Sequence, residues 1–285
     1  MRDLAGRTAV VTGASRGIGP YVARALARER MNLVLAARSA GELEAVAAEL
    51  RGMGVRAAAV PADVSDRAAL AALVEAAERE FGGVDVLVNN AGIELTRPYH
   101  RLSLDEIQQV IQVNLTAAML LARLVLPGML ERGRGHVVNM ASLAGKSGPA
   151  YSEPYAATKA GLIGFTQSFR ATYREMGVSA SAVCPGFVHS VGMYEENRRR
   201  TGLAAPRSLG TSSPEAVARA VVRAVRDDLP EVLVNPGVPP RVLTTLREAA
   251  PSLGEWVVRR MGVTDLYRQA AEARQREHEG TGPAS

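Results

Sequence analysis

The chain has 285 residues, of which 47% are hydrophobic, with a formal net charge of +5 and a single cysteine. That hydrophobic content is ample for a large core, and one cysteine excludes an intramolecular disulfide and suits a reducing compartment. Only 4% of the residues are aromatic and the arginines are scattered, so the composition argues against nucleic-acid binding.

The first residues, MRDLAGRTAVVTG, lack the apolar core of a signal peptide. A membrane span would need about 18 uninterrupted apolar residues. The longest candidate, LTAAMLLARLVLPGML, is interrupted by Arg123 and Pro127. We therefore expect a soluble cytoplasmic protein.

Seven short runs rich in Val, Leu and Ile recur along the chain, with helical segments between them. They are TAVVTG (8–13), NLVLAAR (32–38), VRAAAVPADV (55–64), VDVLVNNAG (84–92), GHVVNMAS (135–142), VSASAVCPG (178–186) and EVLVNPG (231–237). Apolar strands that alternate with helices are typical of a parallel sheet covered on both faces. The prediction is an α/β fold, a doubly wound (Rossmann) seven-stranded parallel sheet, whose ligands bind beyond the carboxyl ends of the strands.

The first strand leads into a glycine-rich turn, TGASRGIG, at residues 12–19. Glycines at Gly13, Gly17 and Gly19 permit a tight turn and let backbone N–H groups approach a pyrophosphate at a helix N-terminus. Because the turn follows a strand and opens an amphipathic helix, it predicts a dinucleotide site.

The end of the second strand indicates which dinucleotide binds. An NAD site usually has an acidic residue here for the ribose 2′-hydroxyl, whereas a 2′-phosphate calls for a nearby Arg. Ala36 and Ala37 occupy the strand end, Arg38 follows, and Arg16 projects from the turn. This pattern favours NADP(H) over NAD(H).

The segment YSEPYAATKA, residues 151–160, contains one of only two lysines in the chain. In a helix, Lys159 lies one turn beyond Tyr155, so its ammonium group sits beside the phenol. A fixed positive charge favours the phenolate, and we therefore expect Lys159 to lower the pKa of Tyr155 and make it a useful acid–base group.

With Tyr155, Lys159 and the glycine-rich turn in place, the chain resembles the short-chain dehydrogenase/reductase family over about residues 5–237. The other motifs of that family also have counterparts here. They are NNAG at 89–92, Asp63 with Val64 after the third strand, Asn114 in the long helix, Ser142 at a strand end, and PGFVHS at 185–190, with Ser190 where Thr is commoner.

The resemblance implies an NADP(H)-dependent oxidoreductase that reduces a ketone or oxidises the secondary alcohol. Tyr155 would donate the proton and Ser142 would hydrogen-bond the same oxygen. Lys159 would also hold the nicotinamide ribose, and Asn114 would fix a water that connects Lys159 to solvent. An NAD-dependent alcohol dehydrogenase of the same fold is the alternative. A regulator that only senses dinucleotides is disfavoured by the intact catalytic residues.

The resemblance also assigns binding residues. The cofactor contacts would be Gly13, Ser15, Arg16, Gly17, Ile18, Gly19, Arg38, Asp63, Val64, Asn90, Ala91, Gly92, Tyr155, Lys159, Pro185, Gly186, Val188 and Ser190. The substrate contacts would be Ile93, Glu94, Leu143, Tyr151, Phe187, Met193 and Tyr194, with a lid at about residues 187–213. The four histidines show no metal-ligand spacing, so no metal site is expected. Relatives form homotetramers or homodimers through the helices that carry Asn114 and Tyr155.

The common core of the family is complete at residue 237, which makes residues 1–237 the predicted catalytic domain and 238–285 a helical extension with a disordered tail. Leu253, Trp256, Val257 and Met261 share one helical face, opposite Arg259 and Arg260. We expect this segment to cover the substrate mouth or a neighbouring subunit. A helix lying on a membrane is the less favoured alternative.

Overall fold

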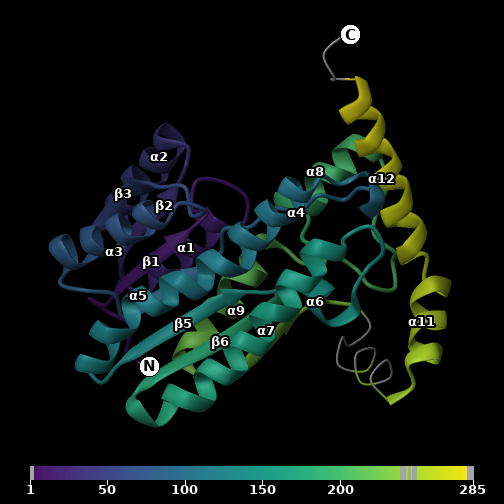
Figure 1. Ribbon diagram of the computed structural model, residues 1–285. Helices are drawn as coiled ribbons and strands as arrows, with labels where there is room; N and C mark the ends of the chain where they lie inside the picture. The colour runs from purple at the N-terminus through teal and green to yellow at the C-terminus, as the bar shows by residue number, and fades with distance from the viewer. Residues whose placement is uncertain (1–2, 238–241, 243–244, 246–248, 281–285) are drawn as a thin grey trace.

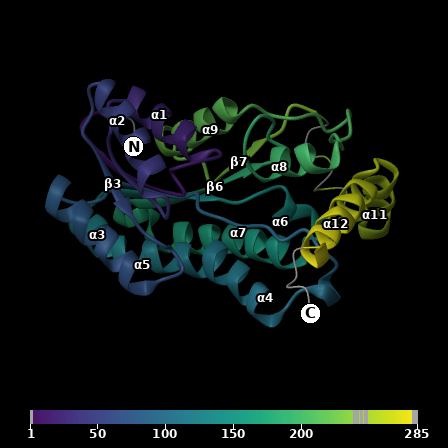
Figure 2. The same ribbon diagram turned by 90° about the horizontal axis from the view of Figure 1, so that it is seen from above.

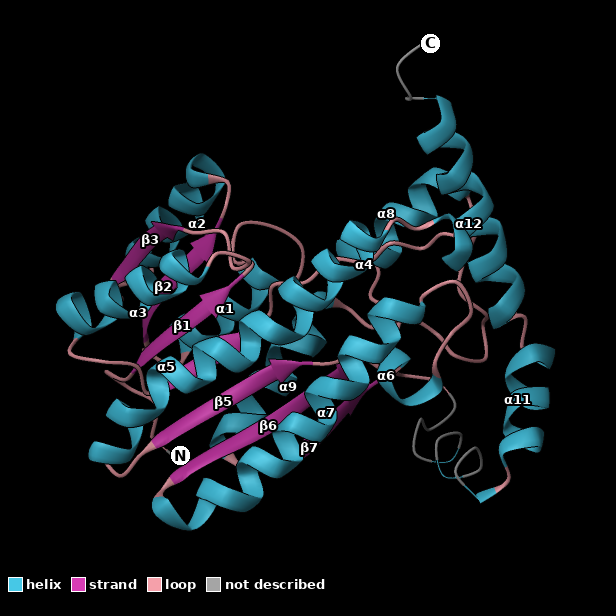
Figure 3. Ribbon diagram, viewed as in Figure 1, coloured by secondary structure: helices cyan, strands magenta, loops and turns pink. Residues whose placement is uncertain are grey.

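The computed structural model describes residues 3–237, 242, 245 and 249–280. Seven parallel strands form one sheet in the order β3-β2-β1-β4-β5-β6-β7, which confirms the predicted fold (Figure 3). The strands are β1 (Thr8–Thr12), β2 (Asn32–Ala37), β3 (Ala57–Pro61), β4 (Val86–Asn89), β5 (Gly135–Met140), β6 (Val178–Pro185) and β7 (Glu231–Val234). The order reverses between β1 and β4, and a crevice for ligands is expected at such a point.

The central strands are buried on both faces. Every residue of β1, β5 and β6 is buried, which matches their nearly continuous apolar sequences. Val11 pairs with Leu35 on one side and with Val88 on the other.

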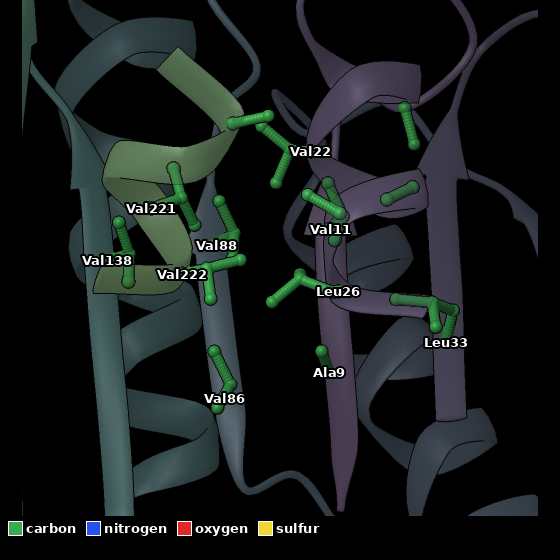
Figure 4. Packing of buried hydrophobic residues seen from close by; sticks show 14 of the residues in the cluster. Ala9, Val11, Val22, Leu26, Leu33, Val86, Val88, Val138, Val221 and Val222 are labelled. Carbon is green, nitrogen blue, oxygen red and sulfur yellow. The ribbon is translucent and has the colours of Figure 1, made fainter. Parts of the chain in front are cut away.

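Helices cover the sheet in two layers (Figures 1 and 2). One layer consists of α1 (Gly19–Arg28), α2 (Ala40–Gly52) and α9 (Pro214–Arg226), and the other of α3 (Arg67–Phe81), α5 (Ala117–Glu131) and α7 (Glu153–Tyr173). In the first layer, Val22 and Leu26 of α1 and Val221 of α9 pack on strand residues such as Val11 and Val88 (Figure 4).

A long helical stretch, Leu104–Glu131, contains α4 (Leu104–Ile111), a π-helical turn (Gln112–Thr116) and α5. By length and composition it is the one stretch among the described residues that would suffice to cross a membrane. Leu121, Val125 and Met129 of α5 are instead buried against the sheet and α3. The α5 part of the stretch is therefore a core helix of the fold.

In the continuous described stretch at residues 249–280, the helices are α11 (Pro251–Arg260) and α12 (Val263–Gly280). They lie beyond the carboxyl ends of the strands, on the side of α6 (Ala144–Ser147) and α8 (Gly192–Thr201) (Figures 1 and 2). Leu253 and Trp256 of the predicted apolar face are 48% and 59% exposed, whereas Ala270 and Ala271 of α12 are buried. The expected disordered tail, residues 281–285, lies outside the described residues.

His136 in β5 is buried and makes the stability of the fold sensitive to acid. Its Nε2 lies 2.8 Å from the hydroxyl of Ser181, which itself donates to the carbonyl of Leu229. Because the hydroxyl proton of Ser181 is donated to Leu229, the hydrogen bond between His136 and Ser181 must be donated by Nε2 of the histidine. Burial lowers the pKa of His136 to about 3, from an ordinary value of 6.5.

We expect the free energy of unfolding to fall as the pH drops from about 6.5 toward 3. In that window the unfolded chain binds a proton at this residue that the folded chain does not, at a cost of up to roughly 5 kcal/mol. Urea unfolding at a series of pH values checks this. In the variant His136→Gln, the free energy of unfolding should depend less steeply on pH between about 6.5 and 3. In His100→Gln, at an exposed position, the pH dependence should match that of the wild type. An unchanged slope in His136→Gln contradicts the assignment.

Candidate active site

A cavity of about 640 Å³ opens at the carboxyl edge of the sheet. It runs from the glycine-rich turn, past the ends of β4, β5 and β6, to helix α12. The predicted residues that line it are Gly13, Arg16, Gly17, Ile18, Arg38, Asn90, Ala91, Gly92, Ile93, Glu94, Ser142, Leu143, Tyr155, Lys159, Pro185, Gly186, Phe187, Val188, Met193 and Tyr194. The structure thus brings most of the predicted cofactor and substrate residues together.

Seven predicted residues do not line this cavity, namely Ser15, Gly19, Asp63, Val64, Asn114, Tyr151 and Ser190. Ser190 is exposed, with a left-handed backbone (φ 71°), and its hydroxyl lies 2.8 Å from Nδ1 of His189. Asp63 accepts hydrogen bonds from the backbone and the hydroxyl of Ser65, which hold the pKa of Asp63 below its usual range. The contacts expected of these two side chains with a cofactor remain predictions.

The glycine-rich turn is packed too closely for side chains. Gly13 has φ 64°, and a Cβ on it would lie 2.9 Å from Cα of Ala91. A Cβ on Gly19 would overlap the carbonyl oxygen of Gly13 and lie 2.8 Å from Cα of Ala14. Gly19 is the first residue of α1, so these contacts bring the turn and the helix N-terminus close to the cavity.

Thr12 joins this turn to the NNAG segment. Its hydroxyl oxygen accepts hydrogen bonds from the backbone N–H groups of Asn90 and Ala91, both at 3.0 Å. The side-chain amide of Asn90 donates to the carbonyls of Thr12 (2.9 Å) and Gly13 (3.1 Å). The ends of β1 and β4 are thereby fixed to each other where the strand order reverses.

The catalytic side chains come from β5 and α7. Ser142 follows β5 and lines the cavity beside Tyr155 of α7. Its hydroxyl accepts from the backbone N–H of Ala144 at 3.1 Å and lies 3.4 Å from the carbonyl oxygen of Pro185. One turn further along α7, Nζ of Lys159 lies 5.5 Å from the centre of the Tyr155 ring and donates to the carbonyl of Met140 at 2.6 Å. The three side chains meet at one end of the cavity.

The pKa of Tyr155 is raised in this structure, opposite to the expected direction. Burial of the phenol is the main cause, the charge of Glu94 adds to it, and the hydrogen bond with Ser142 opposes it. Lys159 is itself buried, which lowers its pKa to about 8. The lysine offsets too little of the cost of burying a phenolate, so the phenol stays protonated through the neutral range and is suited to donate a proton.

Asn114 lies in the π-helical turn and is buried. Its Oδ1 accepts from the backbone N–H of Ile93 and its Nδ2 donates to the carbonyl of Ile93, both at 2.8 Å. Nδ2 also lies 3.2 Å from the hydroxyl of Thr158. The side chain therefore holds the segment that borders the cavity, and its role in fixing a water remains a prediction.

Met261, on the predicted apolar face, lines the cavity, as expected of a segment that covers the substrate mouth. Further lining residues of α12 have no counterpart among the predicted contacts; they are Val263, Leu266, Tyr267, Ala270 and Arg274. Val263, Tyr267, Ala270 and Arg274 recur at intervals of four, three and four, which places them on one helical face. That spacing is the signal that could have found them.

No group of three or more His, Cys, Asp or Glu side chains in the described part of the chain could hold a metal ion. Lys146, the second lysine, borders the cavity but pairs with Glu231 at 2.7 Å.

The sequence profile described as short chain dehydrogenase matches residues 7–201. The chain therefore belongs to the short-chain dehydrogenase family, a family of oxidoreductases, as its motifs indicated.

Individual relatives agree with this assignment. The chain is 43% identical to the ketoacyl reductase HetN of Nostoc sp. over 278 residues, which is 96% of both chains. It is 38% identical to the oxidoreductase UcpA of Escherichia coli K12 over 76% of this chain and 82% of the relative. The structure of a variant of actinorhodin polyketide ketoreductase with NADPH superposes with a TM-score of 0.75 at 32% identity, covering 82% of this chain and 97% of that one. A metagenomic short-chain oxidoreductase in complex with NADP gives 0.70 at 36% identity, covering 83% and 100%.

Proposed function

We propose that the protein is an NADP(H)-dependent reductase of ketones that can also oxidise the corresponding secondary alcohols. One observation carries the proposal. The side chains of Ser142, Tyr155 and Lys159 open into the same cavity as a glycine-rich turn that is flanked by Arg16 and Arg38. Relatives named ketoacyl reductase and ketoreductase, and solved structures with NADPH and NADP, support the same assignment.

The residues of the cavity fit a phosphorylated dinucleotide. Gly13, Gly17 and Gly19 leave room for backbone N–H groups near a pyrophosphate. Arg16 and Arg38 are exposed at this end of the cavity, where no carboxylate follows the buried strand end at Ala37. Two guanidinium groups, with no acidic residue at the strand end to bind a ribose hydroxyl, suit a 2′-phosphate better than a free 2′-hydroxyl.

The cofactor would supply a hydride to the carbonyl carbon. Tyr155 would donate its proton to the carbonyl oxygen, and Ser142 would stabilise the charge that develops there by a hydrogen bond. Lys159 would hold the nicotinamide ribose and supply a positive charge beside the phenolate that remains. Asn114 would keep the segment around Ile93 in place through its two backbone hydrogen bonds.

The cofactor preference can be tested by binding. We expect Arg38→Ala to raise the Kd for NADPH about 10- to 100-fold and to leave the Kd for NADH unchanged, because a charge-assisted contact with the 2′-phosphate is lost. Fluorescence titration measures both constants, and Arg79→Ala at the exposed end of α3 serves as the control. If wild-type protein binds NADH as tightly as NADPH, the NADP(H) assignment is wrong and an NAD-dependent alcohol dehydrogenase is favoured.

We also propose that residues 1–237 form the catalytic domain and that the protein works in the cytoplasm as a homodimer or homotetramer. Four apolar side chains on α4 and α5 support association, because they are exposed without being needed for the core. They are Leu104, Ile111, Met119 and Leu124, which are between 38% and 79% exposed.

A further inference from the structure

Helix α12 lies against the substrate end of the cavity. Leu266, Tyr267, Ala270 and Arg274 contribute to the lining together with Tyr155. The ring centre of Tyr267 is 6.5 Å from that of Phe187. Tyr267 thus lines the same cavity as the catalytic Tyr155. Burial raises the pKa of Tyr267, and the charges of Glu94 and Tyr155 raise it further.

Contacts on two sides hold α12 in this position. Arg274 donates from Nη1 to the backbone carbonyl of Glu94 at 2.9 Å, and from Nε to Oδ1 of Asn197 on α8 at 3.0 Å. One turn later, Glu277 lies 3.5 Å from the guanidinium of Arg200, also on α8. Glu94 follows the NNAG segment, so one side chain of α12 connects both rims of the substrate end.

The charges around this end suit an uncharged substrate. Each cation that lines it has a partner. Lys146 pairs with Glu231, and Arg198 pairs with Glu195 at 2.8 Å. Lys159 donates to the carbonyl of Met140, and Arg274 donates to the carbonyl of Glu94 and to Asn197. The walls are otherwise largely apolar and include Leu143, Phe187, Met193, Tyr194 and Leu266. A substrate carboxylate would have to compete for cations that already have partners, whereas a neutral ketone would not.

We infer that Tyr267 is a specificity-determining residue that limits the bulk of the ketone, with α12 as a wall of the substrate pocket. The substrate class rests on the proposed function, whereas the wall rests on the contacts of α12 alone. Helix α12 lies outside residues 7–201, the part that matches the family profile, yet the Nostoc ketoacyl reductase aligns with 96% of this chain.

Paired substrates test the size limit. With NADPH, we expect Tyr267→Ala to raise the ratio of kcat/KM for acetophenone to kcat/KM for butanone about tenfold, because the space of a phenol ring is freed. Tyr267→Phe should keep the wild-type ratio, since the ring remains. Arg268→Ala, on the exposed side of α12, should keep it as well. An unchanged ratio in Tyr267→Ala overturns the inference, whereas a wild-type protein that reduces neither ketone contradicts the proposed function.

A second measurement tests the wall without turnover. Cys184 is buried and burial raises its pKa to about 12, so it reacts poorly with thiol reagents. The thiols introduced by Tyr267→Cys and by Arg268→Cys can therefore be compared directly with Ellman's reagent. We expect the first to react at least about tenfold more slowly, since it faces the cavity. Adding acetophenone and NADP⁺ should slow the reaction of the Tyr267→Cys thiol further and leave the rate of the Arg268→Cys thiol unchanged. Equal rates for the two variants would mean that α12 does not form the wall.

Discussion

Ketone reduction by the variant Tyr155→Phe should be about 10²- to 10⁴-fold slower than by the wild type, the range typical of a lost general acid. In the proposed mechanism the phenol is the proton donor, and burial keeps it protonated at neutral pH. Steady-state kinetics with NADPH, from pH 6 to about 9, measure the effect. The Kd for NADPH should change little, because the ring of Phe retains the packing of Tyr.

Tyr173→Phe, near the other end of the same helix, is the matched control. Tyr173 packs on Phe169 and lies outside the cavity, so its loss of a hydroxyl should leave kcat unchanged. If Tyr155→Phe retained more than about a tenth of the wild-type kcat, another group would have to donate the proton.

The second large effect is expected at the glycine-rich turn. In Gly19→Ala, the new methyl group would overlap the carbonyl oxygen of Gly13, so the turn or the start of α1 has to move. We expect the Kd for NADPH to rise at least about 100-fold, since the backbone N–H groups no longer converge on the pyrophosphate. The strain should also lower the free energy of unfolding by about 1–3 kcal/mol.

Gly164→Ala provides the comparison, because Gly164 is an exposed helical glycine with no atom within 4 Å of an added Cβ. That variant should bind NADPH normally and gain about 0.5–1 kcal/mol of stability. Titration and thermal unfolding of both proteins check the pair. Normal NADPH binding by Gly19→Ala would show that the cofactor does not use this turn.

Local patterns sufficed to predict most of this structure. All seven apolar runs contain strands. The central strands β1, β4, β5 and β6 are buried on both faces, and their nearly continuous apolar sequences show this directly. The glycine-rich turn and the pair Tyr155 and Lys159 are contiguous or one helical turn apart, so their geometry follows from secondary structure. Those residues were found together at one cavity.

What could not be predicted depends on long-range contacts. Arg274 meets Glu94 across 180 residues of sequence, and no local pattern specifies that pairing. The raised pKa of Tyr155 has the same origin, since Glu94 and the surrounding burial come from other parts of the chain. Ser190 is exposed and has a left-handed backbone, and no local sequence pattern predicts that conformation for a serine.

The π-helical turn at residues 112–116 also limits how this protein can change by insertion or deletion. A π-helical turn contains one residue more than the α-helix around it, and such turns are frequent at functional sites. Deleting one residue there would restore a regular helix, and the wider turn that carries Asn114 would be lost. Asn114 would then leave the backbone of Ile93. The long helix should therefore tolerate substitutions on its exposed side far better than any change in its length.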